Sequence, residues 1–332
     1  MNNLKDIKIG VIGCGYWATN IIKSLEEENF KNVYVFDFDK KKLINAKSKF
    51  FFLQVCNSLN EILSKKLDCV LLVTPTSTHY SLGKAILKKN FNLFIEKPST
   101  LKSQHLKELI NISKKKKLKL MSGYIYIYNT YIQYIKKIIN TKKLGNIKYI
   151  YFERSNLGPI RNDTSCLWDL ASHDLSTAMY LLKSKPKISY VKTYNFLKKN
   201  FFDISSVGLN FKKTKVEIRS NWLNPEKIRK IIIIGEKKML QFDEMEPVNK
   251  IKIYNKYVSY PDIKSFNKSF FTPRVNIYLG KTYVPKIKFK SPIKEELKHF
   301  FYSVKKNKNP ITSGSYALKV LQLLEKIEKH IN

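Results

Sequence analysis

A glycine turn near the amino terminus constrains the fold more than any other feature of this chain. Residues 7–12 are mostly apolar and β-branched, which is typical of a buried parallel strand. Gly13, Gly15 and Ala18 follow as G-x-G-x-x-A, and residues 21–25 are apolar at helical spacing. Gly13 permits a tight turn, Gly15 lets a diphosphate approach the backbone, and Ala18 allows close helix–strand packing. The pattern predicts a diphosphate at a helix amino end, although glycines alone also fit a plain strand-to-helix turn.

An acidic residue after the second predicted strand narrows the expected cofactor to NAD. Asp37 ends the strand-like run 32–37 and lies 22 residues beyond Gly15, close to the offset of ~20 residues expected of an acid that binds the adenosine ribose. A carboxylate there accepts hydrogen bonds from ribose hydroxyls and repels the 2′-phosphate of NADP. The alternative is that Asp37 caps the next helix, but Asp39 is the better placed cap.

Strands and helices alternate through residues 1–122, which predicts a doubly wound parallel sheet of the Rossmann type. The expected strands cover residues 7–12, 32–37, 51–55, 68–73, 91–95 and 118–122. Ser58 and Glu61 form a capping box at the start of one intervening helix. Ligands of such sheets bind at the carboxyl ends of the strands, where the loop 74–79 and the sequence Glu96-Lys97-Pro98 also lie.

Residues 123–332 have a different pattern and are expected to form a second α/β domain with a large mixed or antiparallel sheet. Helices are expected over residues 129–141 and 168–182, and strands over 146–154, 188–196, 201–211, 216–222, 228–234 and 239–242. Residues 244–292 contain five prolines and are expected to form loops and edge strands. Helices over 293–305 and 315–329 complete the pattern.

The formal net charge of +36 first suggests a nucleic-acid or membrane partner. Five of the 62 basic residues are arginine, however, and lysine is spread over nearly every predicted helix. Phosphate and base recognition usually relies on arginine, so this composition argues against a dedicated nucleic-acid surface. No apolar run could span a bilayer and no signal peptide precedes the first strand, which predicts a cytoplasmic protein without membrane insertion.

The four cysteines are far apart and are expected to be buried, reduced thiols. No group of His, Cys, Asp and Glu has the spacing of metal ligands, and we expect no metal.

Taken together, these motifs resemble those of the Gfo/Idh/MocA oxidoreductases, over nearly the whole chain. The motifs that carry the resemblance are G-x-G-x-W-A, Thr74-Pro75 with His79, Glu96-Lys97-Pro98, and Trp168-Asp169-Leu-Ala-Ser-His173-Asp174. The resemblance implies an NAD-binding Rossmann domain and a second domain with one open sheet face, which would join copies into a homodimer or homotetramer. Gly15-Tyr16-Trp17 and residues 156–161 are similar to the branch that acts on nucleotide sugars in surface-glycan synthesis.

Oxidation of a secondary alcohol needs a hydride acceptor, a base for the hydroxyl proton and a positive group for the developing charge. Lys97 is expected beside the nicotinamide, with its ammonium on the reacting oxygen. Asp169 and His173 are four residues apart on one expected helix and project from the same face. His173 is the expected base, with Asp169 orienting it or holding the substrate. The resemblance leaves open whether Lys97 or His173 takes the proton.

The other candidates follow from position and resemblance. Glu96 is expected to bind the nicotinamide ribose or to orient Lys97, with a structural carboxylate as the alternative, and His79 is expected to pack near the cofactor loop rather than to react. The expected cofactor-binding residues are Gly13, Gly15, Tyr16, Trp17, Ala18, Asp37, Thr74, Pro75, Thr76, His79, Glu96 and Lys97. The expected substrate-binding residues are Lys97, Tyr124, Asn156, Arg161, Asp169 and His173.

The leading hypothesis is an NAD(H)-dependent oxidoreductase that acts on a nucleotide-linked sugar, at C3 of a substrate similar to UDP-N-acetylglucosaminuronate. An inositol or free-sugar dehydrogenase, or a ketoreductase, is the alternative within the family. A non-catalytic, cofactor-binding regulatory protein with a basic surface is the alternative from another class. The presence of Lys97, Asp169 and His173 argues against that last hypothesis.

Overall fold

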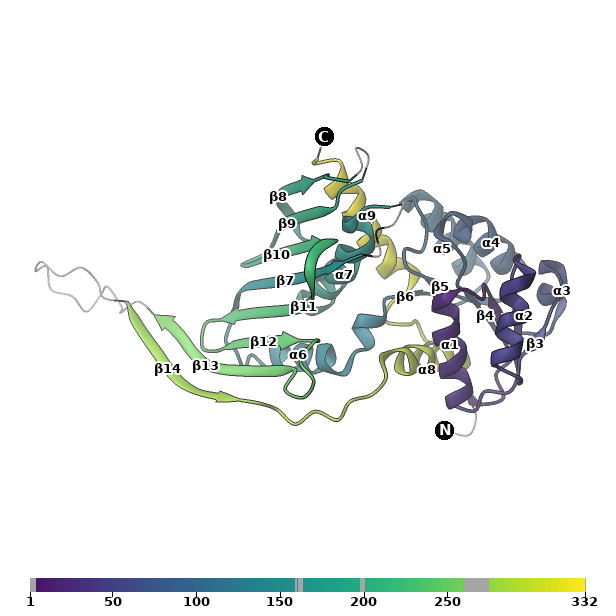
Figure 1. Ribbon diagram of the computed structural model, residues 1–332, viewed down its shortest axis with the longest axis horizontal. Helices are drawn as coiled ribbons and strands as arrows, with labels where there is room; N and C mark the ends of the chain where they lie inside the picture. The colour runs from purple at the N-terminus through teal and green to yellow at the C-terminus, as the bar shows by residue number, and fades with distance from the viewer. Residues whose placement is uncertain (1–3, 159, 161–163, 198–200, 260–274, 332) are drawn as a thin grey trace, which may run out of the picture. The chain divides into compact units, whose positions relative to one another are not determined.

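The computed structural model describes residues 4–158, 160, 164–197, 201–259 and 275–331 (Figure 1). The chain forms two compact units. The first comprises Met1–Asn129 and Lys290–Lys326, and the second comprises Thr130–Phe289 and Ile327–Asn332. The chain therefore returns to the first unit after it has built most of the second.

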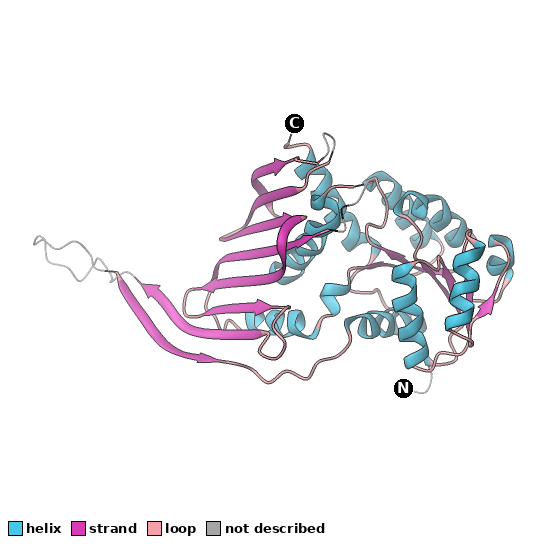
Figure 2. Cartoon of the chain, in the orientation of Figure 1, coloured by secondary structure: helices cyan, strands magenta, loops and turns pink. Residues whose placement is uncertain are grey.

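The first unit contains the predicted Rossmann sheet. Its strands are β1 (Ile9–Ile12), β2 (Val33–Phe36), β3 (Gln54–Val55), β4 (Cys69–Leu72), β5 (Asn92–Glu96) and β6 (Leu120–Gly123). All of them are parallel and their order is β3-β2-β1-β4-β5-β6, which confirms the predicted fold class. Helices cover both faces of the sheet (Figure 2), so β1 and β4 are buried along their whole length. The strand order reverses between β1 and β4, and ligands of such sheets bind outside the carboxyl ends at that point.

The first unit has the following helices, and the capping residues predicted for two of these helices are present. The helices are α1 (Tyr16–Glu27), α2 (Lys40–Lys49), α3 (Leu59–Ser64), α4 (Thr76–Lys88), α5 (Ser103–Lys115), the 3₁₀ turn η2 (Ile125–Tyr128), α8 (Pro292–Lys305) and most of α9 (Gly314–Glu328). Asp39 caps α2 by accepting the N–H of Lys41 at 2.9 Å, and Ser58 caps α3 by accepting the N–H of Glu61 at 3.0 Å.

Aromatic packing fixes α8 in the first unit. Phe301 of α8 packs edge-on against Phe30, with ring centroids 5.0 Å apart, and Phe300 packs against Phe94 of β5 at 5.8 Å. Sequence alone gave no reason to group α8 with the first sheet, because these contacts join residues more than 200 positions apart.

The third strand is shorter than predicted. Residues 51–55 were expected to form a strand, but β3 contains only Gln54 and Val55, and Phe51 is 81% exposed. The reason is local: Phe50 closes α2 and is buried, so the residues that follow it form a turn before the chain reaches the sheet.

The second unit contains a mixed sheet, as predicted. Its strands are β7 (Ile147–Leu157), β8 (Lys187–Tyr194), β9 (Ile204–Phe211), β10 (Thr214–Asn221), β11 (Leu223–Gly235), β12 (Met239–Asp243), β13 (Ile251–Ser259) and β14 (Asn276–Tyr283). Their order is β14-β13-β12-β11-β7-β10-β9-β8, and β7 and β10 run parallel while the other pairs are antiparallel. Helices α6 (Thr130–Asn140) and α7 (Ser172–Leu182) lie against one face (Figure 1). Ile150, Phe152 and Arg154 alternate toward those helices and are buried.

The edge strands expected within residues 244–292 are present, since β14 is the outermost strand at one edge of the sheet. These residues contain β13 and β14, which pair as a ribbon that extends past the ends of the other strands of the sheet (Figure 1). Pro247 and Pro285 lie outside the strands and Pro292 is the first residue of α8, so no proline removes a ladder hydrogen bond from β13 or β14.

The expected helix over residues 168–182 is two elements. A π-helical turn, η3 (Leu167–Ala171), carries Asp169, and α7 begins after it at Ser172. Single turns of this wider kind occur inside α-helices and are frequent at functional sites.

Cys14, Cys56, Cys69 and Cys166 are all buried and free, as predicted. Within the described ranges of the chain, no helix has the length and apolar character needed to cross a membrane. In the same ranges, His, Cys, Asp and Glu side chains form no group of three or more that could hold a metal ion.

Candidate active site

The turn between β1 and α1 has the geometry of an anion cradle. Gly13 has a φ of +103°, and a Cβ there would lie 2.7 Å from the backbone of Val73, so another residue would be strained and would clash. Gly15 precedes α1 and has no atom within 4 Å of the place where a Cβ would stand. No side-chain hydrogen bond caps this end of α1 in the described structure, and the first N–H groups of a helix have no partner within the helix itself. Tyr16 beside them is 88% exposed.

Asp37 closes this turn from the end of β2. Its Oδ2 accepts the N–H of Cys14 at 2.6 Å, and its Oδ1 accepts the N–H of Asp39 at 2.8 Å. Each carboxylate oxygen keeps a further lone pair for a ligand hydroxyl. Burial and the charge of Asp37 raise the pKa of Cys14 to about 12, which keeps the thiol neutral. The two hydrogen bonds therefore hold the Asp37 carboxylate next to the amino end of α1.

The loop after β4 is ordered by its own side chains. Thr74 and Thr78 share a hydroxyl–hydroxyl hydrogen bond of 2.7 Å, and Thr78 also donates to the carbonyl of Pro75 at 2.8 Å. His79 is 1% exposed, and its ring contacts the carbonyls of Thr74 and Pro98. The structure places Thr74, Pro75 and Thr76 at the carboxyl edge of the sheet and His79 in the interior beneath that edge.

Glu96 and Lys97 lie at the carboxyl end of β5. Oε1 of Glu96 accepts the indole N–H of Trp17 at 2.7 Å, and Oε2 accepts the backbone N–H of Lys97 at 3.1 Å. The carboxylate packs over Gly123, where a Cβ would lie 2.8 Å from Oε2, so the absence of a side chain at residue 123 makes room for it. Burial raises the pKa of Glu96 to about 7. Lys97 is half-buried, and the Lys97–Pro98 peptide bond is cis.

The first unit thus brings most of the expected cofactor-binding residues to one edge of its sheet. Ala18 is fully buried inside α1, as its packing role requires. Tyr124, an expected substrate-binding residue, is buried in the interior of the unit, edge-on to Tyr316 with ring centroids 6.1 Å apart.

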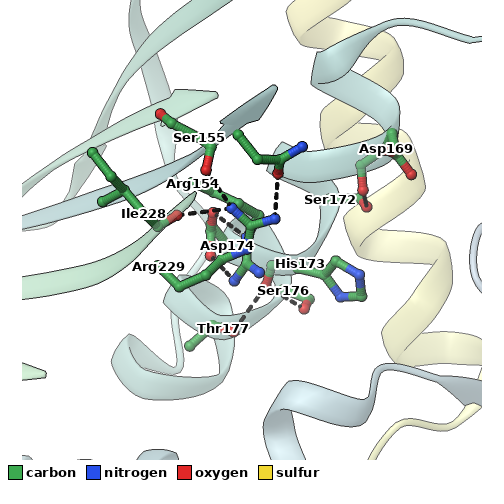
Figure 3. Close-up of polar contacts among 11 residues, drawn as sticks. Arg154, Ser155, Asp169, Ser172, His173, Asp174, Ser176, Thr177, Ile228 and Arg229 are labelled. Atoms are coloured by element: carbon green, nitrogen blue, oxygen red, sulfur yellow. Dashed lines mark hydrogen bonds and ion pairs between the residues drawn. The ribbon is translucent and has the colours of Figure 1, made fainter. Parts of the chain in front are cut away.

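Asp169 and His173 lie on η3 and in the first turn of α7, in the second unit, and both are partly exposed. Ser176 and Thr177 each donate a hydrogen bond of 2.8 Å to the carbonyl of His173. The His173 ring points away from the neighbouring Arg154–Asp174 pair (Figure 3).

Arg154 and Asp174 support this helix and were not predicted. Nε and Nη2 of Arg154 donate to the two carboxylate oxygens of Asp174 at 2.9 and 2.7 Å, and both side chains are buried. The pair anchors the first turn of α7 to β7, next to His173. A signal was present in the sequence: Arg154 follows Ile150 and Phe152 in the alternation of inward residues, and an inward arginine needs a buried acid.

Asn156 lies near the end of β7 and is held by its neighbours. Arg229 donates to the carbonyl of Ser155 (Figure 3) and to Oδ1 of Asn156. Asn156 in turn donates to the carbonyl of Gly158. Arg161 lies outside the described residues.

Two family models match the chain. The model described as the oxidoreductase family with NAD-binding Rossmann fold matches residues 7–124, and the Gfo/Idh/MocA C-terminal domain model matches residues 132–241.

Curated relatives match part of the chain. UDP-N-acetylglucosamine 3-dehydrogenase from Acidithiobacillus ferrooxidans is 26% identical over 164 residues, which is 49% of this chain and 46% of that protein. Inositol 2-dehydrogenase from Rhizobium meliloti is 25% identical over 125 residues, which is 36% of this chain and 38% of that protein. The chain thus spans less than half the length of these relatives.

Solved structures share the whole fold. The A. ferrooxidans UDP-N-acetylglucosamine 3-dehydrogenase GnnA superposes with a TM-score of 0.79 at 19% identity, over 98% of this chain and 97% of that chain. The WlbA dehydrogenase from Bordetella pertussis, solved with NADH and UDP-GlcNAcA, superposes with a TM-score of 0.78 at 17% identity, over 98% and 95% of the two chains. At these identities the likeness shows the fold alone.

Proposed function

The chain belongs to the Gfo/Idh/MocA oxidoreductase family, and on that premise we propose that it transfers a hydride between NAD and a secondary alcohol or ketone of a sugar. The observation that carries the proposal is the position of Gly15, Asp37 and Lys97, which follow β1, β2 and β5 at one edge of a parallel sheet.

The residues of the first unit fit NAD. Gly15 leaves open space at the uncapped amino end of α1, where backbone N–H groups would bind the diphosphate. Asp37 would accept hydrogen bonds from the adenosine ribose and would repel the phosphate of NADP. Trp17 and Glu96 would lie along the nicotinamide half of the cofactor. When bound, NAD supplies the hydride acceptor or donor.

Lys97 is the proposed partner of the reacting oxygen. Its ammonium donates hydrogen bonds to that oxygen and stabilises the negative charge that develops as the hydroxyl proton leaves. The hydrogen bond between the Lys97 N–H and Glu96 holds the lysine backbone at the sheet edge.

His173 is the proposed proton acceptor, and Asp169 its helper. A neutral imidazole takes the hydroxyl proton in oxidation and returns it in reduction. Asp169 orients the ring or holds a sugar hydroxyl. The buried Arg154–Asp174 pair fixes the backbone from which His173 projects.

We propose a nucleotide-linked sugar as the substrate class, oxidised at C3. Two comparisons support this: a curated relative is named for C3 oxidation of UDP-N-acetylglucosamine, and a structural neighbour was solved with UDP-GlcNAcA. Asn156 and Arg161 are the proposed ligands for the diphosphate or a sugar carboxylate.

Substrate profiling tests the function. Purified protein is incubated with NAD and a panel of UDP-, dTDP- and GDP-sugars, with myo-inositol as the alternative substrate, and NADH and oxidised product are measured by mass spectrometry. We expect a keto product from a nucleotide sugar. Turnover of inositol alone would favour the second candidate, which the inositol 2-dehydrogenase relative supports.

Variants test the site. Lys97→Ala and His173→Ala are each expected to lower kcat by about 100-fold or more, because each removes a group that acts in the transition state. Lys102→Ala is the matched control, since Lys102 is exposed and lies outside the proposed machinery. Full activity in the Lys97/His173 double variant would refute the assignment.

A homo-oligomer formed through the open face of the second unit's sheet is also proposed. This face has a hollow of about 460 Å³ lined by Glu153, Tyr190, Glu217 and Arg219 among others. Its side chains are ordered, since Arg219 binds Glu217 at 2.8 Å and stacks over Tyr151. Light scattering is expected to give a dimer or tetramer for the native chain and a smaller species for Arg219→Glu.

A further inference from the structure

His79 joins the turns that follow two neighbouring strands. It lies in the first half of α4, and its Nε2 is 2.8 Å from the carbonyl oxygen of Thr74, just after β4. Its Nδ1 is 3.0 Å from the carbonyl oxygen of Pro98, just after β5. Strands β4 and β5 are parallel neighbours, so the ring spans the gap between their carboxyl ends.

Both partners of the ring are acceptors. A carbonyl oxygen cannot donate, so each contact requires a proton on the ring nitrogen, and a neutral imidazole has one such proton. An imidazolium makes both contacts at once, whereas a neutral ring makes them in turn, the Nδ1 contact in one tautomer and the Nε2 contact in the other. The pKa of His79 lies below its ordinary value, because burial outweighs the opposing effect of the backbone contacts with Pro98, Thr74 and Ser99, so the neutral ring is the favoured form. Burial and these backbone contacts determine the shift in the pKa of His79, and no charged side chain of the described residues contributes to it.

The two carbonyls belong to segments with different proposed tasks. Pro98 directly follows Lys97, and Ser99 is fixed from the other side by a hydroxyl contact with Ser122 of β6. Thr74 begins the loop proposed to shape the cofactor site. A ring that holds both segments sets the distance between the Lys97 backbone and the cofactor loop.

We propose that His79 is a positioning residue for Lys97, which ties the Lys97–Pro98 backbone through Nδ1 and the Thr74–Pro75 loop through Nε2. The inference rests on the proposed role of Lys97. It predicts that the two contacts serve different kinetic constants, because one holds the reacting lysine and the other holds the cofactor loop.

Two amide variants separate the contacts. The side-chain amide of Asn lies near the place of Nδ1, and that of Gln can reach the place of Nε2. His79→Asn is expected to keep kcat within about 3-fold of wild type and to raise the KM for NAD by about 10-fold, the cost of one buried hydrogen bond. His79→Gln is expected to lower kcat by about 10-fold and to keep the KM for NAD within about 3-fold of wild type. His79→Ala is expected to lose both, with kcat reduced by about 10- to 100-fold.

Hydrogen exchange gives a readout that needs no substrate. The N–H of Lys97 donates to Glu96, and its exchange rate is expected to rise about 10-fold or more in His79→Ala and His79→Gln but not in His79→Asn. The affinity for NAD alone, measured by tryptophan fluorescence, is expected to fall in His79→Asn and His79→Ala.

These measurements separate the two proposals. Suppose that wild type turns over no sugar, but that hydrogen exchange at Lys97 and NAD affinity change in the His79 variants as stated. The proposed function is then wrong, and the positioning role of His79 is supported. If folded His79→Asn and His79→Gln give equal changes in every measurement, or if exchange at Lys97 is unchanged in folded His79→Gln, the positioning role is refuted. The amide variants also decide the matter if His79→Ala does not fold.

Discussion

The indole N–H of Trp17 donates a 2.7 Å hydrogen bond to Oε1 of Glu96, while Oε2 of the same carboxylate accepts the backbone N–H of Lys97. Trp17 lies in the first turn of α1, and Lys97 follows β5. Glu96 therefore links the amino end of the proposed cofactor helix to the proposed catalytic lysine. Both contacts are donated to the carboxylate and are strongest when it is ionised.

Activity is expected to rise with pH through about 7 as Glu96 loses its proton. Burial raises the pKa of Glu96 to about 7, so below that pH the carboxyl is neutral and both contacts weaken. Glu96→Gln removes the charge but keeps the shape, and it is expected to lower kcat/KM by about 10-fold at high pH and to remove the part of the rise that is due to Glu96. Profiles of kcat/KM from about pH 5.5 to about pH 9 measure the effect.

Glu296 of α8 offers a matched control for this profile. It is 1% exposed, and burial and the charge of Glu96 raise its pKa well above the ordinary value. Since this acid stays neutral, Glu296→Gln is expected to leave the midpoint of the profile in place. A midpoint that moves down in Glu296→Gln would show that Glu296 is ionised in the active protein.

Protonation of Glu96 is also expected to stabilise the folded state. The pKa of Glu96 is higher in the folded chain than its ordinary value of 4.5, so the folded state holds the proton more tightly. This stabilising contribution is complete below about pH 4.5 and is lost as the pH rises through about 7. The difference in unfolding free energy between wild type and Glu96→Gln is expected to follow that curve. A constant difference across the range would contradict it.

Asp37 is expected to set the preference for NAD over NADP. Asp37→Asn keeps an acceptor for the N–H of Cys14 but removes the charge, so NADP is no longer repelled and the ribose contact weakens. The KM for NAD is expected to rise by about 10-fold, with a larger fall in the ratio of kcat/KM for the two cofactors. Asp39→Ala is the control: it removes the cap of α2, at a cost of about 1 kcal/mol, without changing the preference.

The Arg154–Asp174 pair is expected to stabilise the second unit only while both partners are present. Arg154→Met leaves the buried carboxylate of Asp174 without its partner and is expected to cost about 3–5 kcal/mol. The double variant Arg154→Met with Asp174→Leu is expected to recover most of that loss, because no buried charge remains. Urea unfolding of wild type, the two single variants and the double variant measures the coupling energy between Arg154 and Asp174. Additive effects of the two substitutions would show that the pair does not act as a unit.

Lys136 is expected to make the free energy of unfolding rise with pH in the alkaline range. Its ammonium lies against the carbonyls of Tyr180 and Leu181 at 2.6 Å, near the end of α7. Burial lowers the pKa of Lys136 to about 8, so between about pH 8 and pH 10.5 the unfolded chain binds the extra proton. Stability in that window is expected to rise with pH in wild type relative to Lys136→Met. Parallel curves for the two proteins would refute this.

The sequence by itself determined the first sheet, its capping residues and the type of chemistry to look for. Strand alternation, the glycine turn and the caps at Asp39 and Ser58 depend on neighbours a few residues away, and that information is present in any short window of the chain. The same locality explains why the edge residues Asp37 and Lys97 could be named: the end of a strand in a parallel sheet is a position that spacing alone predicts.

The tertiary structure decided what depends on distant partners. The burial of His79 between two carbonyls, the pairing of Arg154 with Asp174 and the packing of α8 on β5 each join residues that no local pattern connects. The pairing of β13 with β14 likewise joins two segments that a short window of the sequence does not connect. The spacing of residues in the sequence identified side chains suited to cofactor binding and proton transfer. Long-range hydrogen bonds and burial determined which of these side chains are held in place and which residues hold them.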